Sequence, residues 1–289
     1  MQLTRISILG VGLLGGSIGL AAKAFIRGCK ITGYGHRAST LRHAMDVGAI
    51  DRFVLDPAAA VSASDLVILC TPVGVFQDIL RQIAPALPPR AIVTDVGSTK
   101  RSIVRLAEQI LPHKIRFVAS HPMAGSEKRG VEFARPDLFQ NATCITTPTP
   151  HTSKTALAAV ERFWQTIGMH IVRLSPNDHD SLLADVSHLP HAIAAALIAM
   201  QLDHALPLAG AGFLDATRIA GGDGALWRDI LLDNRDNLRA SLARLQKHLA
   251  LLQTLLDDGK ADQLASWLNH AAQRRRHLLQ QKLREVNPD

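Results

Sequence analysis

The strongest constraint on this chain is a glycine pattern at its beginning. Residues 10–15 read Gly-Val-Gly-Leu-Leu-Gly, after the apolar run of residues 6–9 and before a segment with helical spacing. In a strand–turn–helix unit, the first glycine allows a tight turn, the second lets a pyrophosphate approach the backbone, and the third lets the helix pack on the strand. The helix N-terminus then offers N–H groups and a positive dipole end to the phosphates. The pattern predicts a dinucleotide site formed by Gly10, Gly12, Leu13, Leu14 and Gly15.

The glycines also bear on the compartment of the protein. Residues 6–25 are apolar enough to resemble a signal peptide or a membrane span, but glycines stand at positions 10, 12, 15, 16 and 19. This spacing marks a turn rather than a continuous apolar helix. Three widely spaced cysteines, Cys29, Cys70 and Cys144, form neither a disulfide framework nor a zinc pattern. We therefore expect a cytoplasmic protein with no membrane span.

The net charge of +7 and the isoelectric point of about 9.7 allow three interpretations. Basic runs such as residues 274–276 could bind nucleic acid, form a solvated helix face, or create a positive potential that gathers anionic small molecules. No nucleic-acid-binding motif accompanies the charge, so we expect no nucleic-acid partner. The motifs described next favour the small-molecule interpretation.

The chain changes character near residue 175. Before that point, short runs rich in β-branched residues alternate with amphipathic segments such as residues 16–27 and 99–109. The expected strands are residues 5–9, 30–34, 66–71, 91–96, 117–120, 141–146 and 169–174. This alternation predicts an α/β fold, a doubly wound parallel sheet of the Rossmann type with helices on both faces. We expect an NAD(P)-binding domain over residues 1–175.

After residue 175, no strand-like run remains. Residues 180–201, 226–256 and 261–285 carry apolar residues at helical spacing, which predicts an all-helical second domain over residues 176–289. Its long helices present apolar stripes that a domain of about 115 residues can hardly bury internally. We therefore expect this domain to bind substrate and to form a homodimer.

The end of the second predicted strand bears on the choice of dinucleotide. About 20 residues past the glycine pattern, an NAD site usually places an acid on the ribose hydroxyls. Gly35 occupies that place here, followed by His36, Arg37, Ser39 and Thr40. Arg37 can hold a 2′-phosphate in a bidentate fork, although a solvated loop arginine is the alternative. We expect NADP to be preferred, with NAD as the second choice.

Polar residues follow the later strands, at the carboxyl edge where open α/β sheets bind ligands. Thr71 and Pro72 are expected to contact the cofactor. Ser98 lies between a strand and a helix, so its hydroxyl either caps the helix or faces the cleft. His121, at a strand end and fixed by Pro122, is suited to acid–base chemistry near neutral pH, with a structural histidine as the alternative.

The second domain contributes further histidines. His188 and His191 share one face of a predicted helix at i, i+3 spacing. Because His179, Asp180 and Asp185 are near in sequence, a metal site is a second interpretation. The spacing matches no standard zinc signature, so we expect no metal.

Later in the sequence, Arg218 can bind a carboxylate, whereas Trp227 is expected in a core or an interface. Taken in order, the motifs resemble those of the prephenate/arogenate dehydrogenase family. The motifs are residues 10–15, 94–100, 121–127, 187–191 and 217–220. The resemblance extends from residue 1 to about residue 230, and the helical remainder suits that family's dimerisation domain. One of these motifs alone is weakly specific, but five in order are highly specific.

The resemblance implies a reaction in which NAD(P) takes hydride from the carbinol carbon of prephenate or arogenate and the ring carboxylate leaves as CO2. By similarity, His121 accepts the proton of the ring hydroxyl, and Ser98 orients that group. Arg218 corresponds to a carboxylate-binding arginine, and His191 to a histidine at the other end of the substrate. The remaining substrate positions that it implies are Glu127, Asp215 and His188.

The chain departs from its relatives in two respects, and two other functions are compatible with its domain plan. Many relatives keep an acid where this chain has Gly35, and others carry a regulatory domain or a fused chorismate mutase, neither of which we expect here. A β-hydroxyacid dehydrogenase or imine reductase shares the expected two-domain plan, but the former usually uses a lysine early in the helical domain, and residues 176–200 contain none. A cofactor-sensing protein without catalysis would tolerate loss of the polar residues, yet Ser98, His121, His191 and Arg218 are all present.

Overall fold

The computed structural model describes residues 3–112, 116–126 and 128–286. The chain forms two compact units, Met1–Arg235 and Asp236–Asp289. The first unit contains the sheets and all the helices as far as α10, and the second consists of the last two helices.

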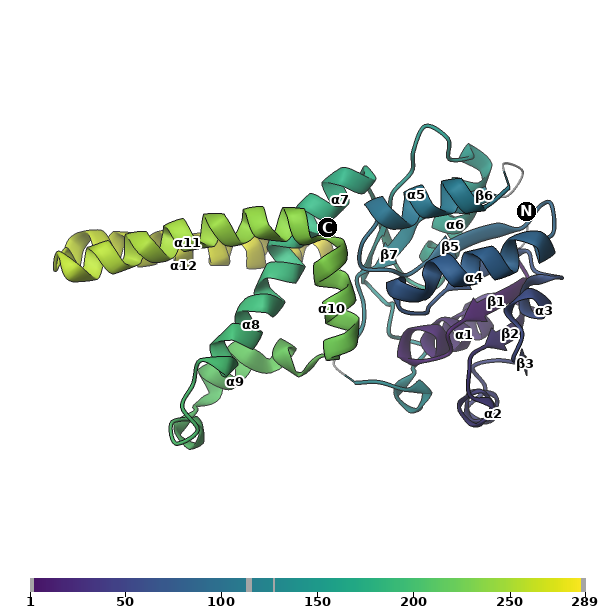
Figure 1. The fold of residues 1–289 in the computed structure, drawn as a ribbon, viewed down its shortest axis with the longest axis horizontal. Coiled ribbons are helices and arrows are strands. Elements are labelled where there is room, and N and C mark those ends of the chain that lie inside the picture. Colours follow the sequence, from purple (N-terminus) through teal and green to yellow (C-terminus); the bar gives the residue numbers. More distant parts are fainter. Residues whose placement is uncertain (1–2, 113–115, 127, 287–289) are drawn as a thin grey trace. The chain divides into compact units, whose positions relative to one another are not determined.

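A six-stranded parallel sheet organises the first unit, in the strand order β3-β2-β1-β4-β5-β6 (Figure 1). Its strands are β1 (Arg5–Leu9), β2 (Lys30–Tyr34), β3 (Arg52–Val54), β4 (Leu66–Leu69), β5 (Ile92–Asp95) and β6 (Arg116–Val118). β1 pairs with β2 on one side and with β4 on the other. The strand order therefore reverses between β1 and β4, and ligands of open α/β sheets bind at the carboxyl edge beside such a reversal. This arrangement confirms the predicted Rossmann-type sheet.

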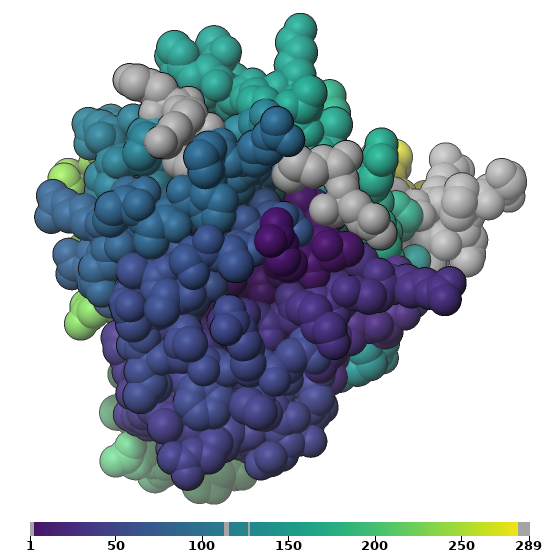
Figure 2. Space-filling model, turned by 90° about the vertical axis from the view of Figure 1, so that its right-hand side faces the viewer, coloured from purple at the N-terminus to yellow at the C-terminus, as the bar shows by residue number. Residues whose placement is uncertain are grey.

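The strands are apolar on both faces because helices cover both. Ile8 belongs to one buried cluster, with side chains of α1 (Leu13–Phe25), α2 (Ala38–Asp46) and α6 (Lys154–Thr166). The next residue, Leu9, belongs to the opposite cluster, with side chains of α3 (Pro57–Val61), α4 (Phe76–Ile83) and α5 (Arg101–Ile110). Successive side chains of a strand point to opposite faces, so two apolar neighbours require two covering layers. Figure 2 shows the segments from β1 to α5, purple to blue, as one closely packed surface.

A second, three-stranded sheet follows, formed by β7 (Ser120–Pro122), β8 (Thr143–Thr146) and β9 (His170–Arg173). β7 runs antiparallel to β8, so the strands after β6 do not continue the parallel sheet. The single strand predicted over residues 117–120 was wrong. It breaks at Ala119, where Ser120 donates its N–H to the Asp95 carboxylate at 3.1 Å instead of extending β6. The three-residue strand β3 was not predicted.

The rest of the first unit is helical, as predicted, but its helices are shorter than expected. They are α7 (Pro176–Leu183), a π-helical turn (Ala184–His188), α8 (Leu189–Ala199), α9 (Ala211–Thr217) and α10 (Gly224–Asp233). The single helix predicted over residues 180–201 is therefore interrupted. Pro190 has no N–H to donate to Val186, which accounts for the widened turn at this point. The helix predicted over residues 226–256 is also divided, because the chain leaves α10 at Asn234.

Pro176–Ala199 is the one helical stretch of the described chain that is apolar enough, by length and composition, to cross a membrane. Its His179, Asp180 and His188 side chains are buried in a polar network within the first unit.

The second unit contains α11 (Arg235–Asp257) and α12 (Ala261–Val286). Between them, Gly259 adopts a φ of +62°, a left-handed conformation that glycine favours. The N–H of Gly259 donates to the carbonyl of Leu256, and that of Lys260 to the carbonyl of Leu255. These bonds end α11 and let the chain turn directly into α12.

Candidate active site

The glycines after β1 have the geometry that a dinucleotide site requires. Gly10 has a φ of +102°, and a Cβ there would lie 2.8 Å from the carbonyl carbon of Cys70. A Cβ at Gly15 would lie 2.1 Å from the carbonyl oxygen of Gly10, so the helix could not pack this closely. A Cβ at Gly12, in contrast, would meet nothing within 4 Å. Space stays open at the glycine where a pyrophosphate approaches, and no side chain caps the N-terminus of α1. These residues fit a dinucleotide.

The end of β2 holds the residues predicted to choose the cofactor. Gly35 follows β2 directly, and Arg37 precedes the first residue of α2. The side chains of His36, Arg37, Ser39 and Thr40 are exposed, and none of them is acidic. This loop, with Arg37, lies at the carboxyl edge beside β1, the edge at which sheets of this kind bind dinucleotides.

Thr71 and Pro72 follow β4, on the other side of β1. The Thr71 hydroxyl is buried and has no hydrogen-bond partner among the described residues. A buried hydroxyl without a partner costs free energy, so this atom is a site at which a ligand could complete the hydrogen bonding.

A buried ion pair lies at the end of β5. Lys100 and Asp95 are in contact, and both side chains are fully buried. The Asp95 carboxylate also accepts N–H groups from Gly97 at 2.8 Å and from Ser120 at 3.1 Å. Burial raises the pKa of Asp95 above its ordinary value, and the Lys100 ammonium and the two N–H donors oppose this effect. The pair fixes the backbone that carries Ser98 on one side and His121 on the other.

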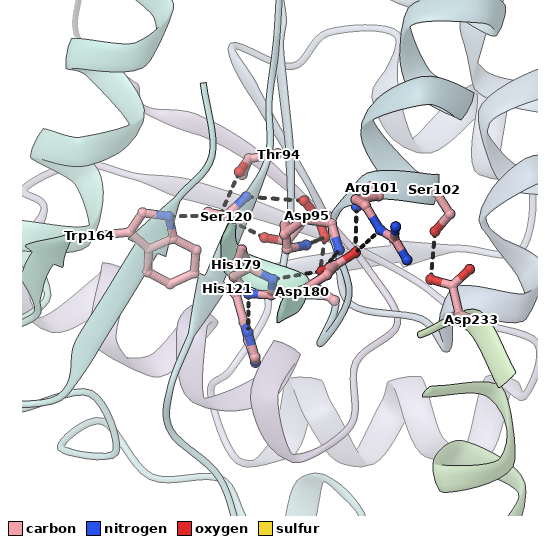
Figure 3. A network of polar contacts seen from close by, with 12 residues as sticks. Thr94, Asp95, Arg101, Ser102, Ser120, His121, Trp164, His179, Asp180 and Asp233 are labelled. Carbon is pink, nitrogen blue, oxygen red and sulfur yellow. Dashed lines mark hydrogen bonds and ion pairs between the residues drawn. The ribbon is translucent and has the colours of Figure 1, made fainter. Parts of the chain in front are cut away.

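The side chain of Ser120 binds this region to the apolar core, as Figure 3 shows. Its hydroxyl donates to the carbonyl of Asp95 at 2.7 Å and lies 2.8 Å from the Thr94 hydroxyl. The indole N–H of Trp164 donates to the same hydroxyl at 3.1 Å. Ser120 therefore fixes the start of β7, one residue before His121.

His121 lies in β7 with only 7% of its surface exposed. Its Nδ1 is 2.9 Å from Nε2 of His179, and Nδ1 of His179 is 2.8 Å from Oδ1 of Asp180 (Figure 3). Burial lowers the pKa of His121 well below 6.5, and His179, Lys100 and His188 lower it further. The imidazole is therefore neutral near pH 7 and able to accept a proton.

Asp180 joins the helical residues to the start of α5. It accepts the backbone N–H of Lys100 at 2.7 Å and that of Arg101 at 2.9 Å. Burial alone would raise the pKa of Asp180, but the bonds from His179 and from these N–H groups outweigh it, and the pKa lies below its ordinary value. The predicted alternative that Ser98 caps this helix was wrong. The cap position is Lys100, without a side-chain capping bond.

The helical residues bring a second pair of histidines to the same region. Asn234 donates to the carbonyl of Asp180 at 2.7 Å and lies 3.1 Å from Nδ1 of His188. Burial lowers the pKa of His188 to about 4, although the Asp180 carboxylate opposes this shift. His191 stacks on the Trp227 indole with ring centroids 3.5 Å apart. Nε2 of His188 and Nδ1 of His191 are buried and have no partner among the described residues. They are the polar atoms that a ligand at this site would satisfy.

Comparison with known proteins agrees with this arrangement. The sequence profile of the prephenate dehydrogenase nucleotide-binding domain matches residues 18–173, and that of the prephenate dehydrogenase dimerization domain matches residues 175–270. The chain belongs to the prephenate dehydrogenase family. It is 36% identical to the prephenate dehydrogenase of Bacillus subtilis, over 92% of this chain and 74% of that protein. It is 34% identical to the cyclohexadienyl dehydrogenase of Zymomonas mobilis, over 90% of this chain and 91% of that protein.

A solved structure of the family has the same fold. The prephenate dehydrogenase of A. aeolicus, in complex with hydroxyphenyl propionate and NAD+, superposes with a TM-score of 0.90 at 34% identity. The match covers 96% of this chain and 99% of that one. The nucleotide-binding profile and this likeness together show that the chain is built for a nicotinamide cofactor.

Three other residues were predicted to bind substrate: Arg218, Asp215 and Glu127. Arg218 begins a 3-10 turn (Arg218–Gly221) that packs against α8, and both Arg218 and Asp215 are exposed. Glu127 lies outside the described residues. Within the described chain, no group of three or more His, Cys, Asp and Glu residues could hold a metal ion.

Three residues have contacts that the sequence did not predict. Trp227 was expected in a core or interface, but it is half-buried and stacks on His191. His179 and Asp180 were considered only as metal ligands, whereas they contact His121 and the N-terminus of α5. The local sequence indicated only that a helix begins after Ser175, with His179 and Asp180 in its first turns.

Proposed function

We propose that this chain catalyses the oxidative decarboxylation of prephenate or arogenate, giving 4-hydroxyphenylpyruvate or tyrosine in tyrosine biosynthesis. The observation that carries the proposal is the buried, neutral His121 beside the carboxyl edge of a dinucleotide-binding sheet. The unpartnered nitrogens of His188 and His191 support a polar substrate on the helical side of the same region.

The proposed residue roles follow from the charge changes in this reaction. A bound nicotinamide would supply the acceptor for the hydride of the carbinol carbon. His121 takes the hydroxyl proton at Nε2, and the Ser98 hydroxyl orients that group. The electron pair of the breaking carbon–carboxylate bond enters the ring, which becomes aromatic as CO2 leaves. Arg218 holds a carboxylate of the substrate, and His191 binds its other end.

Turnover itself tests the proposal. Formation of reduced cofactor is measured with prephenate and with arogenate, each with NADP and with NAD. We expect release of CO2 in step with cofactor reduction for at least one substrate. A β-hydroxyacid dehydrogenase would oxidise a β-hydroxy acid instead and reduce no cofactor with these two substrates, and a cofactor-sensing protein would show no turnover with any of them. Either result would contradict the proposal, and the ratio of kcat/KM values for the two substrates defines specificity.

We also propose that the enzyme binds NADP in preference to NAD. It is supported by Gly35 in place of an acid and by the exposed Arg37 guanidinium beside it. Arg37→Ala removes one charge-assisted contact with the 2′-phosphate, so we expect NADP affinity to fall roughly 10- to 100-fold. NAD affinity should stay unchanged, because NAD has no phosphate at that position. The dissociation constants of both cofactors are the measurement, and an equal loss for both would contradict the assignment.

We also propose that the chain forms a homodimer through residues 175–270, the part that matches the dimerization profile. Between residues 176 and 235, large apolar side chains stay exposed: Leu182, Val186, Ile198, Met200, Leu202, Leu206, Leu208, Leu214, Leu226 and Leu232. So many exposed apolar groups are typical of an interface. Light scattering at micromolar concentration should give the mass of two chains. The mass of one chain would contradict this part of the proposal.

A further inference from the structure

We propose that His179 and Asp180 fix the tautomer of His121 and thereby make its Nε2 the proton acceptor. This inference rests on the proposed function, in which His121 takes the hydroxyl proton. The supporting feature is a line of three buried side chains, from Asp180 through His179 to His121, seen in Figure 3. His179 is fully buried, and Asp180 is only 1% exposed.

The positions of the hydrogens follow from the donors around Asp180. Its Oδ1 accepts the N–H of Lys100, and its Oδ2 accepts the N–H of Arg101. Donors on both oxygens favour the ionised carboxylate, and these bonds together with the one from His179 hold the pKa of Asp180 below its ordinary value, so the group is a carboxylate near pH 7. The 2.8 Å contact from Oδ1 to Nδ1 of His179 is then a hydrogen bond only if Nδ1 carries the proton.

The position of the ring proton on His179 decides the position of the ring proton on His121. Burial lowers the pKa of His179, so this imidazole is neutral near pH 7 and holds a single ring proton. With that proton on Nδ1, Nε2 of His179 is a bare acceptor. The 2.9 Å contact to Nδ1 of His121 then requires His121 to be the donor. His121 is also neutral, so its own Nε2 is left with a free lone pair.

The charged groups around the two rings favour this arrangement over a protonated one. Lys100 and His188 act against a positive charge on His121, while Asp95 is in contact with Lys100 and offsets its charge. On His179, Lys100 acts against a positive charge, whereas Asp180 and Asp95 favour one. Burial is the largest of these effects on both rings, and it favours the neutral forms.

The arrangement has a consequence for catalysis. When Nε2 of His121 takes the proton, the ring becomes an imidazolium and its Nδ1–H bond to His179 becomes charge-assisted. His179 is in turn hydrogen-bonded to the Asp180 carboxylate, so the new positive charge is stabilised without a second proton transfer. His179 and Asp180 are therefore positioning residues that act through His121.

The tautomer can be read directly in the wild-type protein. In protein labelled with 15N at histidine, long-range 1H–15N spectra distinguish a protonated ring nitrogen from a bare one, and comparison with His121→Asn assigns the His121 signals. We expect His121 with Nδ1 protonated and Nε2 bare in the protein without substrate. A protonated Nε2 would overturn the inference. This readout does not depend on turnover, so it stays decisive even if the proposed reaction is wrong.

Kinetics of matched variants give the second test. His179→Leu removes the acceptor for Nδ1–H of His121, and we expect kcat to fall about 100-fold with little change in cofactor KM. His179→Gln keeps an oxygen that can accept this bond and should recover most of the loss. Equal kcat values for the Leu and Gln variants would overturn the inference.

A control variant separates positioning from helix stability. Ser175→Ala removes the side-chain cap of α7, the helix that carries both positioning residues. The lost hydroxyl is bonded to Asp178, and the backbone bond from the His179 N–H to the Ser175 carbonyl is kept. We expect a lower melting temperature with unchanged kcat and an unchanged His121 tautomer. A tautomer change in Ser175→Ala would show that α7 packing alone sets the tautomer, which would also overturn the inference.

Discussion

The two ends of the proposed site are built in opposite ways. The nucleotide end, residues 10–15 with 35–40 and 71–72, consists mainly of backbone and of exposed side chains such as Arg37. The chemical end, where His121, His179 and Asp180 meet the Asp95–Lys100 pair, consists of buried polar side chains with nearly complete hydrogen bonding. Both lie at the carboxyl edge of strands, yet the second is much more fully shielded from water.

The two ends differ because binding a pyrophosphate and accepting a proton require different surroundings. A pyrophosphate needs space and N–H donors, which glycines supply without help from side chains. A proton acceptor needs a pKa set by its surroundings, and burial shifts a pKa far more than an exposed neighbour can. Shielding has a cost, because each buried charge must be paired and hydrogen-bonded. We therefore expect loss of a buried charge partner at the chemical end to affect folding, and a side chain added in the open space of the nucleotide end to affect binding.

The largest expected effect is on stability, at the chemical end. Lys100→Met leaves the Asp95 carboxylate buried without its cation, which typically costs about 3–5 kcal/mol. For a unit of this size, such a loss corresponds to a fall in melting temperature of roughly 10 °C. Calorimetry or circular dichroism measures it, with the exposed Lys30→Met as the control. If Lys100→Met melted at the same temperature as the control, the buried Asp95–Lys100 pair would not contribute to the stability of the fold.

A smaller effect, on binding alone, is expected at the nucleotide end. A Cβ at Gly12 meets no protein atom, so Gly12→Ala should keep the wild-type melting temperature. The added methyl group occupies the space of the pyrophosphate, and cofactor affinity should fall at least about 10-fold, which corresponds to roughly 1.4 kcal/mol. Gly15→Ala is the counterpart, because its Cβ would lie 2.1 Å from the Gly10 carbonyl oxygen and should destabilise the fold. If Gly12→Ala bound the cofactor as the wild type does, the dinucleotide would have to lie elsewhere.

The same contrast explains how much the sequence could predict. The nucleotide end was predictable because its signal is local: a strand, three glycines and a helix within 20 residues of one another. Residue types alone also pointed to His121 and His191. The link between His179 and His121 was not predictable, because it depends on α7 packing against the N-terminus of α5, 80 residues earlier in the chain.

The misplaced element boundaries have the same origin. β6 ends at Val118 because Ser120 is bound to Asp95, a contact made across 25 residues. α10 ends at Asp233, and the side chain of the next residue, Asn234, is bound to the carbonyl of Asp180, 54 residues away. Apolar periodicity carries no information about such polar contacts, so it extended both elements too far.

The central claim is that a buried, neutral His121 accepts the proton as hydride leaves, and the pH dependence of kcat/KM tests it most directly. His121 acts unprotonated, so activity falls as the pH drops through its pKa, and burial places that pKa well below 6.5. For the wild type we predict constant kcat/KM from pH 8 to about 6.5 and an acidic limb only below that value. His121→Asn should lower kcat at least about 100-fold and remove the acidic limb, while cofactor affinity is retained. An unchanged kcat with the acidic limb intact in His121→Asn would contradict the claim and assign the proton to another group.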